Sequence, residues 1–302
     1  IWSNLITTLW CRAVRERAPE VRQHGYVDDR TLTTRSIRAL QVALDATAAF
    51  DLATGQRTNA GKSSVWSNSD RPEIRAALAR LRLAGGALTT VAHDKNLGVQ
   101  LFYSGKVHPA LLAQRGVKMV EAAERLQRLR LQLRHKERLA GTAVVPILLY
   151  GAEQHAPTWT TLSACSKAVD AAIRGTRYRT RAPEILFTAV LNGARTDPVQ
   201  ALTLDAFFTT LRVLRKRQPL AEQQARIWHA RQHRDCAVPG PVSRLNDLFD
   251  RWNWQWVGPH QVRRPDGRAL HLLRDPKSHL HEAARDAERQ LQRRYLTQPT
   301  RT

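Results

Sequence analysis

Two adjacent carboxylates, Asp28 and Asp29, are the residues of this sequence best suited to chemistry. Neighbouring side chains on a straight strand point to opposite faces, so both acids can serve one site only at the sharp bend of a hairpin. Residues 21–34 are typical of two short strands about this pair. Crowded carboxylates repel each other, and divalent cations offset that repulsion where a phosphoryl group is held between two metals. The alternative is an ordinary turn or helix cap, in which Asp pairs are common.

A second candidate is the basic segment from Glu121 to Leu139. Its leucines recur at helical spacing, and basic residues occupy the remaining arc. The leucines are Leu126, Leu129 and Leu133, and the basic residues are Arg125, Arg128, Arg130, Arg134, Lys136 and Arg138. The pattern predicts one helix that docks through its leucines and lays its arginines along duplex phosphates. The alternative is a solvated charged face.

Two further patterns have competing interpretations. His229, His233 and Cys236 have i, i+4 and i+7 spacing, which suits zinc ligands on one helical face, but a fourth ligand is not apparent. Surface histidines are therefore favoured. The tryptophans at 252, 254 and 256 alternate as on a strand, followed by Pro259 and Gly267, which indicates a short hairpin. Base stacking on these indoles is one reading, and burial in a core is the commoner one.

The elements that must position these residues follow from periodicity and caps. Residues 1–17 predict a helix that Pro19 ends, and the strand pair at 21–34 comes next. Ser36 predicts the cap of a helix that runs to Gly55. Further segments follow in order: a strand at 64–66, a helix from Pro72 to Gly85, a strand at 97–103, a helical hairpin at 109–139, and a mostly helical remainder.

Charge and cysteine content limit the class of partner. The 302 residues carry a formal charge of +22, which favours a large polyanion, with nucleic acid ahead of a membrane surface. No run of about 18 apolar residues is available to span a membrane. Cys11, Cys165 and Cys236 are odd in number and widely separated, so neither a disulfide framework nor a zinc ribbon is indicated. We expect a reducing, intracellular compartment.

Four segments together resemble reverse transcriptases of non-LTR retrotransposons. The sequence Y-V-D-D at 26–29 resembles the Y-x-D-D box, and G-Q-R-T-N-A-G-K-S at 55–63 resembles the G-x-x-x-N-x-x-K-[ST] segment. The sequence N-L-G-V at 96–99 is similar to the L-G-V strand that opens the primer-gripping hairpin. The sequence L-L-Y-G-A-E at 148–153 is similar to a stretch of the thumb region. Each segment is short, but all four stand in family order.

The resemblance implies an RNA-directed DNA polymerase that acts on an RNA template, a DNA primer and deoxynucleoside triphosphates. It implies that Asp28 and Asp29 are metal ligands for two Mg²⁺ or Mn²⁺ ions in the intact enzyme. Lys62 would lie near the triphosphate, where it could donate a proton to pyrophosphate, and the location would be nuclear. Primer or substrate contacts are implied at Tyr26, Asn59, Leu97 and Gly98.

Two departures from the family pattern affect these expectations. Arg30 follows the acidic pair directly, where a smaller or apolar residue is typical, and it is expected either to pair with Asp29 or to point to solvent. The family's remaining metal-binding Asp lies on an upstream strand, and neither Glu16 nor Glu20 is a convincing substitute. We therefore expect residues 1–302 alone to be inactive as a polymerase.

The expected architecture is α+β, with three parts. Residues 1–105 are predicted to form a partial palm, a small antiparallel sheet with helices. Residues 106–160 are predicted to form a helical thumb, and residues 161–302 a basic, mostly helical extension. Two alternatives stay open: a non-catalytic nucleic-acid-binding protein with relic polymerase motifs, and a helical module that binds acidic proteins.

Overall fold

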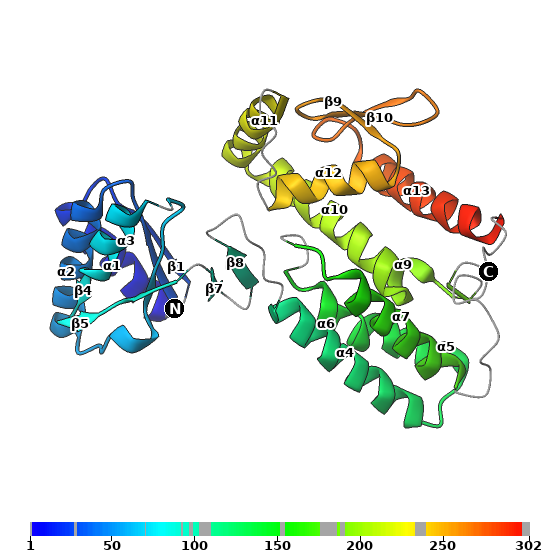
Figure 1. Ribbon diagram of the computed structural model, residues 1–302, viewed down its shortest axis with the longest axis horizontal. Helices are drawn as coiled ribbons and strands as arrows, with labels where there is room; N and C mark the ends of the chain where they lie inside the picture. The colour runs from blue at the N-terminus through cyan, green and yellow to red at the C-terminus, as the bar shows by residue number, and fades with distance from the viewer. Residues whose placement is uncertain are drawn as a thin grey trace. The chain divides into compact units, whose positions relative to one another are not determined.

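The computed structural model describes residues 2–26, 29–69, 71–91, 93–96, 99–102, 110–151, 155–175, 186–187, 191–232 and 240–297. The chain is mixed α+β, as expected, and it divides into two compact units, residues 1–107 and residues 108–302 (Figure 1). The boundary between the two units, at residue 107, lies close to residue 105, where the palm was predicted to end. Among the described residues, no helix is long and apolar enough to cross a membrane.

The first unit combines helices with small two-stranded sheets. Its helical elements are α1 (Trp2–Arg17), α2 (Ile37–Thr54), the 3-10 turn η1 (Ala60–Lys62) and α3 (Pro72–Ala79). Its strands are β1 (Arg22–Tyr26), β2 (Asp29–Thr33), β3 (Ser64–Val65), β4 (Arg82–Leu83), β5 (Gly86–Ala87), β6 (Thr89–Thr90), β7 (His93–Asn96) and β8 (Val99–Phe102). The pairs β1–β2, β4–β5 and β7–β8 are antiparallel, and β3–β6 is parallel.

Local signals account for the helices of this unit. The Ser36 hydroxyl accepts a hydrogen bond from the Ala39 N–H, and Gly55 ends α2 with φ 69°, a conformation that favours glycine. Trp10 and Val14 of α1 are fully buried against the alanine-rich face of α2. The predicted helix from Pro72 begins at that residue but ends at Ala79 instead of Gly85, where β4 and β5 form a hairpin.

The second unit is mostly helical. Its helices are α4 (Ala110–Arg128), α5 (Leu133–Leu139), the π-helical turn η2 (Ala140–Val144), α6 (Pro146–Leu149), α7 (Trp159–Arg174), α9 (Gly193–Thr196), α10 (Pro198–Lys216), α11 (Gln218–Gln232), α12 (Pro241–Arg251) and α13 (Lys277–Thr297). Its strands β9 (Gln255–Gly258), β10 (Gln261–Arg263) and β11 (Ala269–His271) form a sheet in the order β11-β10-β9. The sequence predicted a hairpin here, and the third strand was missed.

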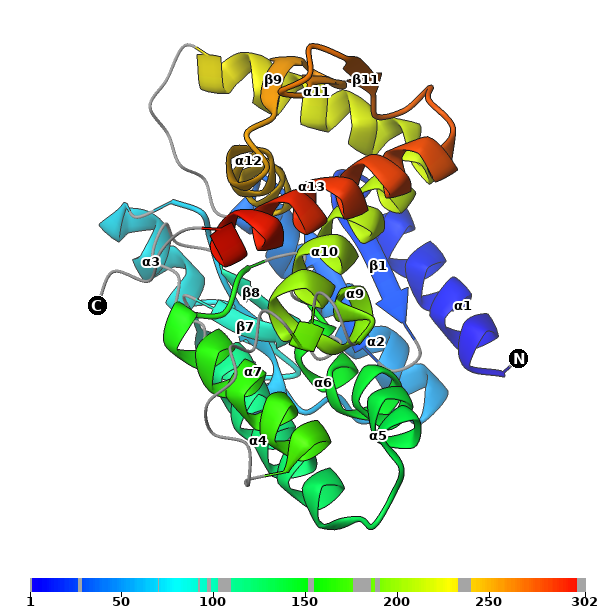
Figure 2. The same cartoon turned by 90° about the vertical axis from the view of Figure 1, so that its right-hand side faces the viewer.

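Two hydrophobic cores fill the second unit, and α10 runs between them (Figure 1 and Figure 2). Leu202 of α10 belongs to the first core, with Met119 of α4 and Val169 of α7. Phe207 of α10 belongs to the second, with Trp252. The predicted boundary at residue 160 falls within the first core, since that core contains residues from both sides of it.

Two helices cover most of residues 110–139, as the helical hairpin predicted at 109–139 requires, but the break between them falls inside 121–139. The prediction of one helix across residues 121–139 is therefore wrong. α4 ends at Arg128, and α5 begins only at Leu133. Leu126 is buried, but Leu129 is 49% exposed and Leu133 is 46% exposed, so no continuous leucine stripe docks. The residues directly after α5, Ala140 and Val144, are buried in the first core, and this burial favours the bend.

Burial is the correct reading of the tryptophans. Trp252 and Trp254 are each 4% exposed and lie in the second core, while Trp256 on β9 is partly buried and packs against it. Phe207 meets the rings of Trp252 and Trp254 edge to face, with centroids 5.1 and 6.2 Å apart. The indoles therefore do not form an exposed stacking surface.

Candidate functional site

The two strands predicted within residues 21–34 are present as an antiparallel pair, on either side of residues 27 and 28, which lie outside the described residues. β1 pairs with β2 from Arg22↔Thr33 to Tyr26↔Asp29, so the two strands come together at Asp29. Asp29 is the first residue of β2, and its side chain is exposed. Asp28 lies outside the described residues, and of Tyr26 only the backbone pairing is described. An exposed carboxylate next to a second Asp in the sequence suits a hard cation, which prefers carboxylate oxygens.

A glycine brings this hairpin close to α1. A Cβ added to Gly25 would lie 2.3 Å from Cγ2 of Thr7, well inside contact distance. Gly25 therefore allows β1 to cross α1 at close range, directly before the Y-V-D-D residues. The sequence pattern did not reveal this requirement for glycine at position 25.

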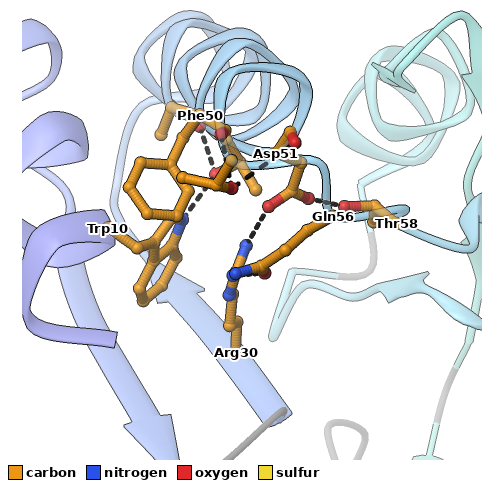
Figure 3. A network of polar contacts seen from close by, with 9 residues as sticks. Trp10, Arg30, Phe50, Asp51, Gln56 and Thr58 are labelled. Carbon is orange, nitrogen blue, oxygen red and sulfur yellow. Dashed lines mark hydrogen bonds and ion pairs between the residues drawn. The ribbon is translucent and has the colours of Figure 1, made fainter. Parts of the chain in front are cut away.

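Arg30 neither pairs with Asp29 nor points to solvent, so both predictions for this residue are wrong. Its Nη1 donates to Oδ1 of Asp51 at 2.6 Å, and its Nη2 donates to Oε1 of Gln56 at 2.5 Å (Figure 3). The Arg30 side chain is 17% exposed and that of Asp51 is 6% exposed, so the ion pair is largely buried. The guanidinium also lies 5.2 Å from the ring centroid of Trp10 and 5.6 Å from that of Phe50. Arg30 is thus bound to the end of α2 rather than to its neighbour Asp29.

The segment from Gly55 to Ser63 begins at this ion pair. The Thr58 hydroxyl donates to the second carboxylate oxygen of Asp51. The next residue, Asn59, caps η1, and its Oδ1 accepts a hydrogen bond from the Lys62 N–H at 3.3 Å. Lys62, the last residue of η1, is exposed, as is Asn59. The polar contacts therefore connect the hairpin strand β2 to the loop that carries Lys62.

The predicted primer-gripping segment also lies at a hairpin. β7 and β8 pair from His93↔Phe102 to Asn96↔Val99. The sequence predicted a single strand from 97 to 103, and the structure has strands on both sides of the pair Leu97 and Gly98. Those two residues lie outside the described residues.

The five candidate arginines of the second unit are all exposed. Arg125 and Arg128 belong to the last turn of α4, Arg130 to the connector, and Arg134 and Arg138 to α5. The ion pair between Arg125 and Glu121 is long, at 3.7 Å, and solvated. Such a pair contributes little, so it leaves the cation available to a polyanion.

The described residues do not support the other candidate metal site, which consists of His229, His233 and Cys236. His229 is exposed on α11, and His233 and Cys236 lie outside the described residues. Within the described ranges, no group of three or more His, Cys, Asp or Glu side chains could hold a metal ion. Asp28 is not among those residues, so this search does not include the pair at 28–29.

Sequence reasoning missed the residues that organise the site. Arg30 was noticed as unusual after the acidic pair, but Asp51 lies 21 residues away and Gln56 lies 26 residues away. No local spacing links these positions. No signal in the sequence pointed to Asp51, because α2 also carries Arg38, Gln41 and Asp45.

Comparison with known proteins adds no assignment. No family model matches the chain, and no curated protein or solved structure matches it. The functional reading therefore depends on the residues and contacts described above.

Proposed function

We propose that this chain is part of an RNA-directed DNA polymerase of a non-LTR retrotransposon, which adds deoxynucleotides to a primer 3′ end. The observation that carries the proposal is the pairing of β1 with β2 up to Asp29, together with the polar contacts from Arg30 to the Gly55–Ser63 segment. Two segments that resemble the family in sequence are thereby joined in space. They stand in the family's order.

In this proposal Asp28 and Asp29 hold Mg²⁺ or Mn²⁺. When bound, the metal ions lower the pKa of the attacking hydroxyl and stabilise the leaving pyrophosphate. Lys62 is exposed on η1, and its ammonium group is attracted to the triphosphate of the incoming nucleotide. The partners are an RNA template and a DNA primer, and a nuclear location belongs to the same proposal.

The second unit supplies the duplex contact. Five exposed arginines along α4, the connector and α5 suit phosphates, because each guanidinium can donate two parallel hydrogen bonds. Residues 106–160 then correspond to a thumb. Of the three leucines that were expected to dock this surface, only Leu126 is buried, so in this proposal the arginines line a bent segment rather than one straight helix.

Primer extension on an RNA template with Mg²⁺ or Mn²⁺ tests the proposal. Residues 1–302 are compared with the same chain joined to the sequence encoded upstream of Ile1. We expect extension only by the longer chain, and loss of extension when Asp28→Asn is introduced. Extension that survives Asp28→Asn, or its absence from both chains, would contradict the polymerase assignment.

A second candidate is a nucleic-acid-binding protein without catalysis, which the exposed arginines favour equally. Mn²⁺ titration of residues 1–302 separates the two functions. A relic site has no reason to keep metal affinity that depends on Asp28, whereas the polymerase proposal requires it. Competition between nucleic acid and acidic protein at moderate salt tests the third alternative, a module for acidic proteins.

A further inference from the structure

Arg30 makes contacts that no other residue type can reproduce together. One guanidinium nitrogen donates to Asp51 and another donates to Gln56, at 2.6 and 2.5 Å. The guanidinium also lies near the rings of Trp10 and Phe50 (Figure 3). A lysine keeps the charge, but its single ammonium lacks the planar fork. The chain therefore uses the geometry of arginine here as well as its charge.

The ion pair lies between two segments with proposed roles. On one side, Arg30 is the neighbour of Asp29 in β2. On the other side, the second oxygen of Asp51 accepts from Thr58, which directly precedes the cap residue Asn59 of the Lys62 turn. A continuous series of covalent and hydrogen bonds thus runs from the metal-binding hairpin to the lysine.

Stability alone is a weak reason for such a pair. Removing two charges from water is costly, and a buried ion pair can often be replaced by apolar residues without loss of stability. What a guanidinium that donates to Asp51 and to Gln56 at once does provide is a fixed relative position of the groups that it joins. Metal-assisted phosphoryl transfer requires such a fixed position, because its chemistry depends on placement.

We propose that Arg30 is a positioning residue that holds the β1–β2 strand pair and the Lys62 loop together as one body. The inference rests on the proposed function for the roles of the two segments. In this proposal Arg30 is not a ligand of the metal or the nucleotide, because its guanidinium is bonded to Asp51 and Gln56. It acts through Asp51, Gln56 and Thr58.

Hydrogen exchange of residues 1–302 without metal tests whether Arg30 couples the two segments. We expect Arg30→Lys to speed amide exchange roughly tenfold in both 29–33 and 60–63, the effect expected when one charge-assisted hydrogen bond is removed. Exchange in α3 stays unchanged. Thr58→Ala should speed exchange in 60–63 alone, because it breaks only the hydrogen bond from Thr58 to Asp51. The matched control is Arg57→Lys, an exposed arginine of the same loop.

Several results would overturn the inference. Arg30→Lys could speed exchange in only one of the two segments, or equally in α3. Either result would show that Arg30 stabilises the unit in general and does not couple the two segments. If Arg30→Lys prevents folding, Thr58→Ala still tests the inference. Exchange in 60–63 of Thr58→Ala at the rate of the unmodified chain would show that the contact with Asp51 does not hold the loop.

Added Mn²⁺ separates this inference from the proposed function. In the unmodified chain, Mn²⁺ should slow exchange at both 29–33 and 60–63, and in Arg30→Lys at 29–33 alone. Protection of 60–63 that persists in Arg30→Lys would overturn the positioning role. The polymerase proposal requires an effect of Mn²⁺ on exchange that is lost in Asp28→Asn. If no such effect is seen, the polymerase proposal fails, but the metal-free comparison still decides whether Arg30 couples the two segments.

Discussion

Arg30–Asp51 in the first unit and Arg251–Glu288 in the second are both ion pairs between an arginine and a buried carboxylate, but their surroundings differ. Glu288 is 1% exposed and accepts from Nε and Nη2 of Arg251 at 3.1 and 3.2 Å. It also accepts from the Trp252 indole N–H at 2.6 Å. The bonds of Glu288 thus remain within the core formed by α12 and α13.

The bonds of Asp51 lead out of a core instead. Its two carboxylate oxygens accept from Arg30 on the hairpin and from Thr58 in the loop. The first unit has small cores of mostly alanine and leucine, whereas the second core of the other unit is rich in aromatic rings. The comparison indicates that an ion pair of this kind satisfies polar groups inside a core in one unit, and is bonded to both a strand and a loop in the other.

The largest expected effect is that of removing Glu288. Glu288→Ala removes the carboxylate bound by Arg251 and by the Trp252 indole, so both groups lose this acceptor. We expect a decrease of about 4 kcal/mol in the free energy of unfolding of the second unit, slightly discounted because Arg251 is 31% exposed. Urea unfolding measures it, with Glu282→Ala on the exposed face of α13 as the control. Equal decreases in the two variants would show that Glu288 is not an organising residue.

The next effect concerns pH. Burial raises the pKa of Asp197 from 3.8 to about 6, and Glu288 adds to the rise while the hydrogen bond from Val199 opposes it. Below pH 4 both the folded and the unfolded states are protonated at this site. Between pH 4 and 6 the unfolded chain loses the proton first, so stability should fall as the pH rises, by on the order of 3 kcal/mol.

Asp197→Asn should flatten that fall and raise stability above pH 6, because asparagine keeps the N-cap of α10 without a charge. Thermal unfolding between pH 4 and 7 measures the difference from the unmodified chain. The control is Asp266→Asn, which changes an exposed carboxylate. An unchanged slope in Asp197→Asn would show that this carboxyl is ionised in the folded state throughout the range.

A smaller effect is expected at the first pair. Asp51→Asn keeps an acceptor for Thr58 but removes the charge that Arg30 requires, and both side chains are largely buried. We expect about 2 kcal/mol of destabilisation, confined to residues 1–107. Urea unfolding followed by hydrogen exchange in each unit measures it. The control is Asp45→Asn, an exposed acid of the same helix, and an equal effect there would remove the special status of Asp51.

The sequence predicted those parts of the fold whose signals are local. Ser36 and Gly55 mark the ends of α2, and alternating residues on either side of Asp28 mark the two strands of the hairpin. The contacts of Arg30 could not be predicted, because a salt bridge between β2 and α2 has no periodicity. The roles of Asp28, Lys62 and the other polymerase residues come from resemblance and stay predictions.

The break between α4 and α5 shows the opposite failure, a local signal that tertiary structure overrides. Leucines at helical spacing favour one helix, but Ala140 and Val144 are buried in the first core directly after α5. The Lys136 ammonium donates to the Gln127 carbonyl at 3.2 Å, next to the end of α4. Burial of the following residues and this hydrogen bond both favour the bend, and neither is visible as a hydrophobic period.

The smallest effect on stability, and the one that tests the nucleic-acid surface, is expected at the arginines of this bend. Replacing Arg128, Arg130 and Arg134 with Gln should change the free energy of unfolding by less than about 0.5 kcal/mol, because all three side chains are exposed. The affinity for a duplex should nevertheless fall on any sequence. Each neutralised phosphate releases condensed counterions, so the slope of log K against log salt should flatten by about 0.9 for each phosphate that the variant no longer neutralises. Fluorescence anisotropy with an RNA–DNA duplex across a salt titration measures the slope. The control replaces three exposed arginines on other segments: Arg212, Arg226 and Arg274. Equal flattening in both triple variants would mean that net charge alone binds the duplex, whereas flattening confined to the bend would assign the thumb contact to α4 and α5.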